Sequence, residues 1–209
     1  MARILITSGP TRQYLDPIRF LSNASSGRMG CALATAALAA GHEVVVVSGP
    51  VNVDYPAAAE VITVVTTQEM LSASVEQFPS CDGVIGVAAP CDFAPAAVAK
   101  EKIKKTEGNL TLELVGTPDI MMALGELKQE HQWSIGFALE TENGHANAVE
   151  KLGRKQCDLI VLNSADAINS EINSIKVIDS AGESVRDFSG SKTDAAEVIV
   201  DAIQHRFGS

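Results

Sequence analysis

The sequence predicts an α/β protein with a doubly wound, mostly parallel sheet and helices on both of its faces. Short Val- and Ile-rich runs alternate with longer helical patterns, which is typical of successive βαβ units. Several of these runs are apolar without interruption, as in strands that are covered on both faces. With 209 residues, 46% apolar and only 4% aromatic, the chain is expected to form one domain around a substantial core.

Each element of the first half of the chain has its own signal. Apolar runs between glycine, proline or polar residues mark the strands, and Met70, Leu71 and Val75 share one face of a helical segment. An insertion at 8–22 separates the first strand from an Ala-rich helix. The elements expected here are strands at 4–7, 44–48, 61–65 and 82–88 and helices at 31–40 and 67–77.

The second half continues the alternation and ends in a helix. Residues 110–115 alternate apolar and polar side chains, which indicates a strand with one exposed face or one arm of a hairpin. Thr117 is expected to cap a helix that has Pro118 at its first position and that runs to about Leu127. The other expected elements are strands at 134–138, 158–162, 175–178 and 184–188, the last two as a hairpin, and helices at 143–155 and 193–206.

A turn of small residues, 21–30, leads into the first helix. Unpaired backbone N–H groups and the positive end of the helix dipole face forward at such a point, so the turn can bind a phosphate or a carboxylate. The glycine fingerprint of dinucleotide-binding proteins is absent after the first strand. The alternative is a capped helix start whose glycines only permit close packing, and the turn by itself leaves both interpretations open.

Composition excludes several classes of protein. The net charge of −10 argues against nucleic acid or an anionic membrane as a partner. The four cysteines and four histidines form no set with the spacing of metal ligands, so structural zinc is not expected. No apolar run is long enough to span a bilayer, and the N-terminus lacks a signal-peptide layout. We therefore expect a cytoplasmic protein.

Three unusual segments lie after or at the ends of predicted strands, at 8–27, 88–105 and 136–140. In a doubly wound sheet, ligands bind outside the carboxyl ends of the strands, so these segments are expected to share one site. In the second segment, Asp92 could ligate magnesium or hold part of a nucleotide. The lysines at 102–105 suit a triphosphate, and the alternative for them is a solvated charged turn.

Six segments, in this order along the chain, resemble the signature segments of phosphopantothenoylcysteine synthetase. They lie at 6–12, 16–20, 22–27, 101–105, 136–141 and 155–163. The resemblance is closest to the bacterial form that uses CTP, and it implies a single synthetase domain at 1–209 with a Rossmann-like sheet and a lysine-bearing flap. In that form the domain is commonly fused behind a flavin-dependent decarboxylase. No flavin is expected in this chain, and the decarboxylase is expected as a fused or separate partner.

The resemblance implies a two-step ligation in coenzyme A biosynthesis. The carboxylate of 4′-phosphopantothenate attacks the α-phosphate of CTP to give an acyl-cytidylate and pyrophosphate, and the amine of L-cysteine then displaces CMP. Mg²⁺ is implied with CTP, and a homodimer is implied in which a flap of one subunit completes the site of the other. The loop at 89–95 departs from the bacterial pattern, so ATP in place of CTP stays open.

The resemblance also implies the roles of individual residues. Asn23 is the implied polar group at the acyl-phosphate centre, where its neutral amide can hydrogen-bond both the acyl oxygen and a phosphate oxygen. Lys102 is the implied catalytic lysine. Lys104 and Lys105 are expected beside it on a flap that closes over the nucleotide. Phosphopantothenate or another anion is expected at Arg19, Ser25, Ser26 and Gly27. The implied nucleotide-binding residues are Gly86, Val87, Ala88, Asp92, Lys102, Pro118, Asp119, Ile120, Met121, Phe137, Lys151 and Lys155.

Two other classes of function remain open. The first is a nicotinamide-dependent oxidoreductase on the same fold, against which stand the missing glycine fingerprint and the lack of a Tyr-x-x-x-Lys pair. The second is a nucleotide-binding module without catalytic activity. Asn23 and Lys102 argue against it, because a protein that only binds a nucleotide needs no amide at the acyl position. Binding of NADPH, or binding of CTP without release of pyrophosphate, would favour these alternatives.

Overall fold

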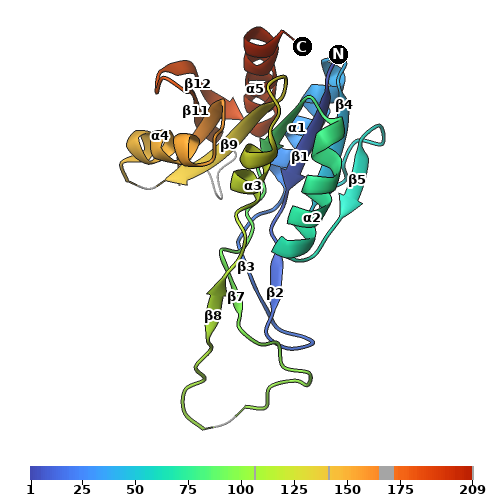
Figure 1. Cartoon of the computed structure of the whole chain (residues 1–209), viewed down its shortest axis with the longest axis vertical. Helices are drawn as coiled ribbons and strands as arrows, with labels where there is room; N and C mark the ends of the chain where they lie inside the picture. The colour runs from blue at the N-terminus through green and yellow to red at the C-terminus, as the bar shows by residue number, and fades with distance from the viewer. Residues whose placement is uncertain (106, 141, 165–171, 209) are drawn as a thin grey trace.

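The central feature of the computed structural model is an eight-stranded sheet with the strand order β12-β11-β10-β9-β6-β1-β4-β5 (Figure 1). The structure describes residues 1–105, 107–140, 142–164 and 172–208. The strands of this sheet are β1 (Arg3–Ser8), β4 (Glu43–Ser48), β5 (Glu60–Thr63), β6 (Gly83–Gly86), β9 (Trp133–Glu140), β10 (Leu159–Ser164), β11 (Ile172–Asp179) and β12 (Ser184–Ser191).

Six neighbouring strands of this sheet, from β5 to β10, are parallel, and the β11–β12 hairpin joins the edge at β10 in antiparallel fashion. The chain builds from β1 through β4 to β5, and then returns to the other side of β1 at β6. This is the strand order of doubly wound nucleotide-binding folds. The order reverses between β1 and β6, so the carboxyl ends of these two strands mark the expected ligand position. The predicted fold class is confirmed.

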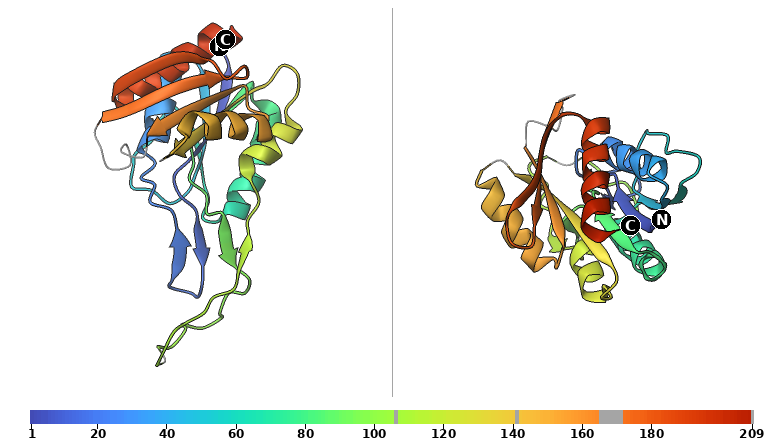
Figure 2. Two further views of the ribbon diagram at one scale, coloured as in Figure 1. Left: turned by 90° about the vertical axis from the view of Figure 1, so that its left-hand side faces the viewer. Right: turned by 90° about the horizontal axis from the view of Figure 1, so that it is seen from above.

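Helices cover both faces of the sheet (Figure 2). Along β1, Ile4 and Ile6 belong to a core formed with α1 and α5, whereas Leu5 belongs to a core formed with α2, α3 and α4. All three side chains are fully buried, which explains the uninterrupted apolar runs. No helix in the described ranges has the length and apolar character needed to cross a bilayer. The helices are α1 (Arg28–Ala39), α2 (Thr67–Gln77), α3 (Ile120–Leu127), α4 (Gly144–Arg154) and α5 (Lys192–Phe207), with a 3₁₀ turn at Phe78–Ser80.

Two narrow antiparallel pairs extend away from the end of the sheet opposite the two termini (Figure 1). The pair β2 (Arg12–Tyr14) and β3 (Phe20–Ser22) lies inside the insertion that follows β1. The pair β7 (Phe93–Pro95) and β8 (Leu114–Gly116) carries the lysine-rich connection between its two strands. We call these two pairs the arms. They place the segments after β1 and after β6 next to each other beyond the sheet.

The structure corrects three details of the sequence prediction. The insertion forms the β2–β3 hairpin, which was not predicted, and the strand expected at 110–115 is confined to Leu114–Gly116. Asp119, not Thr117, caps α3, because its side chain accepts a hydrogen bond from the backbone of Met122 at 3.2 Å. Pro118 therefore precedes the helix. The Thr117 hydroxyl instead donates to the carbonyl of Cys91, and so ties the two ends of the β7–β8 arm together.

Candidate functional site

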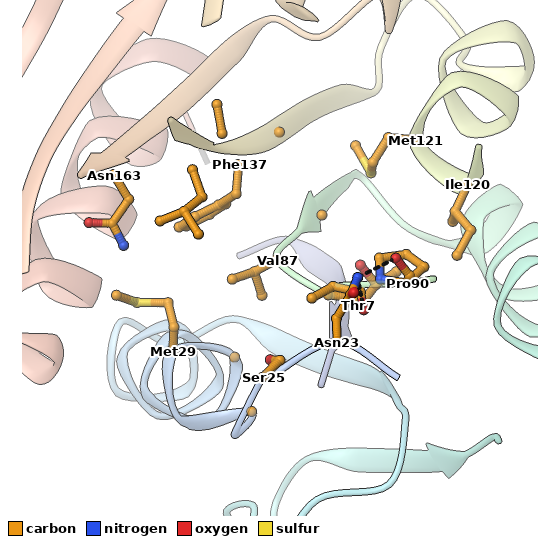
Figure 3. A pocket seen from close by; sticks show the side chains of 18 of the residues that line it. Thr7, Asn23, Ser25, Met29, Val87, Pro90, Ile120, Met121, Phe137 and Asn163 are labelled. Carbon is orange, nitrogen blue, oxygen red and sulfur yellow. Dashed lines mark hydrogen bonds between the residues drawn. The ribbon is translucent and has the colours of Figure 1, made fainter. Parts of the chain in front are cut away.

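A pocket of about 740 Å³ opens at the carboxyl ends of β1, β6 and β9, where the strand order reverses (Figure 3). Its size suits a nucleotide-sized ligand. It brings together most of the residues expected from the sequence. These are Asn23, Ser25, Ser26, Gly27, Gly86, Val87, Ala88, Asp92, Pro118, Asp119, Ile120, Met121, Phe137, Lys151 and Lys155.

The start of α1 forms one wall of the pocket. Gly27 is the N-cap in the left-handed conformation at φ 73°, and a Cβ there would lie 2.7 Å from a methyl of Val51. Only glycine fits this position without strain. Within the described residues no side chain caps the helix, and its first turn holds no acidic residue. The N–H groups of the first turn thus remain available to an anion.

Asn23 spans the pocket from this turn to the loop after β6. Its Nδ2 donates to the carbonyl oxygens of Pro90 at 2.9 Å and Ala89 at 3.3 Å (Figure 3). Both amide hydrogens are therefore used, although the amide was expected to donate to the acyl and phosphate oxygens. Within the described residues Oδ1 accepts no hydrogen bond. In this geometry Asn23 offers a ligand an acceptor, not a donor.

Buried hydroxyl groups support the loop that Asn23 contacts. Thr11 Oγ1 accepts a hydrogen bond from the backbone N–H of Cys91 at 2.8 Å and lies 2.8 Å from the hydroxyl of Thr67. Gln13 adds a third group, with its Nε2 2.8 Å from Thr67 Oγ1. The thiol of Cys91 is buried and faces the carbonyls of Thr11 and Leu21. The cysteine therefore has a structural position, and the network fixes the pocket floor.

Two lysines at the C-terminal end of α4, Lys151 in its last turn and Lys155 at its C-cap, supply positive charge to the opposite wall. Lys155 Nζ lies 3.0 Å from Asp119 Oδ1, and both side chains are half-buried. Burial would raise the pKa of Asp119, but the hydrogen bond and charge of Lys155 lower it below its ordinary value. Burial lowers the pKa of Lys151, and the neighbouring charge of Lys155 lowers it further. An anionic ligand would relieve this repulsion.

Apolar side chains line the part of the pocket between these walls. Figure 3 shows Phe137 and Val87 facing Met29 across the space, with Met121 and Ile120 at its other end. Gly86 makes this packing possible, because a Cβ there would lie 2.2 Å from the sulfur of Met121. Such a surface, with polar groups at its edges, is suited to a flat heterocycle.

Four of the expected site residues lie outside the pocket lining. Lys102, Lys104 and Lys105 are exposed on the connection between β7 and β8. Arg19 pairs with Asp16 at 2.7 Å, and its Nη2 also donates to the carbonyl of Ile103. In the described part of the chain its Nη1 has no partner, so a donor remains for an anion. In this arrangement Lys102 does not line the pocket of its own chain.

The pocket also contains residues that sequence reasoning did not select. Met29, Asn163 and Lys192 line it, and the buried Oδ1 of Asn163 has no hydrogen-bond partner among the described residues. Asn163 stands at a strand end within a segment that carried the resemblance, so its position was a usable signal. Lys192 begins α5, far along the chain, and nothing in the sequence pattern connects it to the site.

The donor set of the pocket suits a cation that arrives with a ligand. Among the described residues there is no group of three or more His, Cys, Asp or Glu side chains that could hold a metal. Of the two pocket carboxylates, Asp119 is paired with Lys155, whereas Asp92 is exposed and has no ion-pair partner in the described ranges. Mg²⁺ commonly combines one protein carboxylate with substrate phosphates. Asp92 fits that arrangement.

Comparisons with known proteins find similar sequences along nearly the whole chain. The model of the DNA/pantothenate metabolism flavoprotein C-terminal domain matches residues 1–207. A cysteine/cysteine sulfinic acid decarboxylase from an unknown prokaryotic organism is 46% identical over 183 residues, 85% of this chain and 51% of that protein. The coenzyme A biosynthesis bifunctional protein CoaBC of Bacillus subtilis is 46% identical over 165 residues, 78% of this chain and 40% of that protein. This chain thus spans about half the length of these curated relatives.

A solved structure extends the likeness to three dimensions. The crystal structure of the C-terminal domain of the coenzyme A biosynthesis bifunctional protein CoaBC superposes with a TM-score of 0.84 at 36% sequence identity. The superposition covers 99% of this chain and 95% of that chain.

Proposed function

Because the chain belongs to the DNA/pantothenate metabolism flavoprotein C-terminal domain family, we propose that it is a CTP-dependent phosphopantothenate–cysteine ligase. Its relative in Bacillus subtilis is named for coenzyme A biosynthesis. The observation that carries the proposal is the pocket at the switch point, which gathers fifteen of the nineteen expected site residues.

In the first step, the triphosphate binds between the open N–H groups of α1 and the lysines of α4. The heterocycle packs against Phe137 and the backbone of residues 86–88. The carboxylate of 4′-phosphopantothenate attacks the α-phosphate, and the bond to pyrophosphate breaks. Lys102 stabilises the charge that develops there once the flap closes. The protein supplies orientation and charge, and no side chain forms a covalent intermediate.

In the second step, the amine of L-cysteine attacks the acyl carbon and CMP leaves. Asn23 Oδ1, which has no partner within the described residues, is suited to accept a hydrogen bond from this amine. That role replaces the donor role expected from the sequence, because both Nδ2 hydrogens already meet carbonyl oxygens. The ligation contains no redox step, so it requires no flavin.

Mg²⁺ enters this proposal as part of the nucleotide complex. When bound, it would neutralise charge on the triphosphate, and Asp92 is the pocket carboxylate suited to hold it. Asp119 is less suited, since Lys155 already neutralises it.

We also propose that the chain acts as a homodimer through its arms. Large apolar side chains are exposed on the β7–β8 arm and its connection, an arrangement that marks contact surfaces. They are Phe93, Val98, Leu110, Leu112, Leu114 and Val115. Dimer formation would cover them and bring a flap close to the partner's pocket. A decarboxylase, fused or separate, is the expected further partner, since the curated relatives are about twice as long as the matched region.

The experiment that tests the proposal measures pyrophosphate release from CTP and Mg²⁺ with 4′-phosphopantothenate. Release should require phosphopantothenate, and Lys102→Ala should slow it by about 100-fold or more. Lys176→Ala is the matched control, because Lys176 is an exposed lysine on β11 that pairs only loosely with Asp187, at 3.9 Å. It should retain the wild-type rate.

Other outcomes of this assay identify the alternatives. Release with ATP and not with CTP would show that ATP is the nucleotide substrate, and the proposed type of reaction would stand. Binding of CTP without release under any condition would contradict ligase activity and favour a binding module. Tight binding of NADPH without binding of CTP would favour an oxidoreductase.

A further inference from the structure

Asp16 is a fully buried carboxylate that lies outside the pocket, in the turn between β2 and β3. Its Oδ1 accepts hydrogen bonds from the backbone N–H groups of Ile18 at 3.0 Å and Arg19 at 2.9 Å. Its Oδ2 accepts from Arg19 Nε at 2.8 Å and from the backbone N–H of Ile103 at 3.0 Å. A buried charge is retained only when it is satisfied in this way.

The two oxygens of Asp16 serve different parts of the chain. Oδ1 holds its own turn, as in an ordinary Asx turn. Oδ2 reaches Ile103, which is 87 positions away in the sequence. Arg19, held by the same oxygen, donates to the carbonyl of Ile103. The Asp16–Arg19 pair therefore binds both backbone polar groups of one residue on the β7–β8 connection.

Ile103 stands between Lys102 and Lys104, so this contact lies in the middle of the lysine cluster. The amides of Lys102, Lys104 and Lys105 make no hydrogen bond within the described residues. Closer to β7, the backbone N–H of Ala99 donates to the carbonyl of Leu15 at 2.9 Å. The connection is thus attached to the neighbouring hairpin at two points, and Asp16 supplies the one beside Lys102.

We propose that Asp16 is a positioning residue for the lysine flap, and that with Arg19 it fixes the backbone from which Lys102 and Lys104 extend. The clamp itself rests on geometry, whereas its effect on turnover rests on the proposed ligase function. Burial raises the pKa of Asp16, but the hydrogen bonds from Ile18, Ile103 and Arg19 outweigh burial and lower it to about 2. The clamp is therefore charged throughout the neutral range and does not act as a pH switch.

Asp16→Asn tests this proposal directly. The substitution keeps the shape of the side chain and one carbonyl oxygen, but it replaces the other acceptor by an NH₂ group. If the NH₂ replaces Oδ2, it faces Arg19 Nε and the N–H of Ile103. If it replaces Oδ1, it faces the N–H groups of Ile18 and Arg19 and disrupts the turn that holds Oδ2 against Ile103. Either orientation therefore loosens the contact with Ile103. Asp201→Asn is the matched control, because Asp201 pairs with Arg186 at 3.4 Å on the exposed surface of α5.

Hydrogen exchange in the absence of substrates gives the first readout. In Asp16→Asn, the Ile103 amide should exchange about tenfold faster or more, while amides of β1, β4 and β6 keep their wild-type rates. With CTP, 4′-phosphopantothenate and cysteine, kcat should fall by about tenfold or more with a smaller change in the KM for CTP. Asp201→Asn should change neither the exchange rate of the Ile103 amide nor kcat.

Unchanged exchange at Ile103, or unchanged kcat in a variant whose Ile103 amide is freed, would overturn the proposal. If Asp16→Asn does not fold, hydrogen exchange in the wild-type protein tests the clamp. Its Ile103 amide should be protected and the amides of Lys102 and Lys104 should not, and equal exchange would overturn the clamp. A freed Ile103 in a protein whose wild type releases no pyrophosphate would contradict the proposed function and leave the clamp standing.

Discussion

At the scale of the residue, Lys151 connects the electrostatics of the pocket to a measurable pH dependence. Burial lowers its pKa, the nearby charge of Lys155 lowers it further, and Glu140 and Asp119 raise it. A lysine with a lowered pKa destabilises the folded state while it is protonated. The free energy of unfolding should therefore rise as pH increases from the folded-state pKa of Lys151 towards its ordinary value of 10.5.

A bound triphosphate should act in the opposite direction. It favours the protonated amine, so CTP affinity should weaken as pH rises from neutral towards that folded-state pKa, with proton uptake on binding. Lys151→Gln should remove this dependence and weaken binding at pH 7. Titration calorimetry from pH 7 to 10, in buffers of different ionisation enthalpy, measures both the CTP affinity and the number of protons taken up on binding. A wild-type affinity that is flat over the range, or a dependence that persists in the variant, would contradict this account.

At the scale of the element, the segments that follow β1 and β4 depend on a very close backbone contact. A Cβ at Gly49 would lie 1.7 Å from the carbonyl oxygen of Pro10. Pro10 forms a bridge with Ala89, so the same contact supports the loop that Asn23 contacts. A displacement of the backbone after β4 should therefore move Pro10 and, through it, the loop after β6 that lines the pocket.

Gly49→Ala should accordingly lower the free energy of unfolding by about 1–3 kcal/mol, because a backbone atom must move to admit the methyl group. Gly153→Ala is the matched control, since Gly153 lies in α4 and, among the described residues, the added Cβ would meet no heavy atom within 4 Å beyond its chain neighbours and the backbone of its own helix. It should stabilise the protein by about 0.4–1 kcal/mol. Urea unfolding gives both values, and a neutral Gly49→Ala would show that the contact relaxes at little cost.

At the scale of the whole molecule, the arms and the connections at their ends carry most of the large apolar side chains that are exposed in the described part of the chain. Val115 is 48% exposed on the β7–β8 arm, and Leu127 is 52% exposed at the end of α3, away from the arms. If the arms form the dimer contact, Val115→Asp should shift the protein towards monomer. Leu127→Asp should leave the dimer intact. Sedimentation equilibrium distinguishes these outcomes, and a wild-type monomer at micromolar concentration would contradict the proposed dimer.

Local signals in the sequence predicted the sheet and the edge at which the pocket lies, whereas the individual pocket residues were implied by the family resemblance. Apolar runs such as that at Val44 to Val47 report burial on two faces, and residues that end parallel strands must meet at one edge. The arms were harder to predict, since three-residue strands carry almost no periodicity. Asp16 lies in a segment that carries the resemblance, but its role could not be predicted from the sequence, because its contact with Ile103 exists only in the folded chain.

If the carboxylate of phosphopantothenate attacks the α-phosphate in this pocket, one of its oxygens must leave with CMP, and isotopic labelling can follow that oxygen. 4′-Phosphopantothenate with ¹⁸O in both carboxylate oxygens is turned over with CTP, Mg²⁺ and cysteine, and the products are analysed by mass spectrometry. The account predicts one ¹⁸O in CMP and the other in the new amide. Label in inorganic phosphate, or unlabelled CMP alongside the amide product, would contradict attack at the α-phosphate.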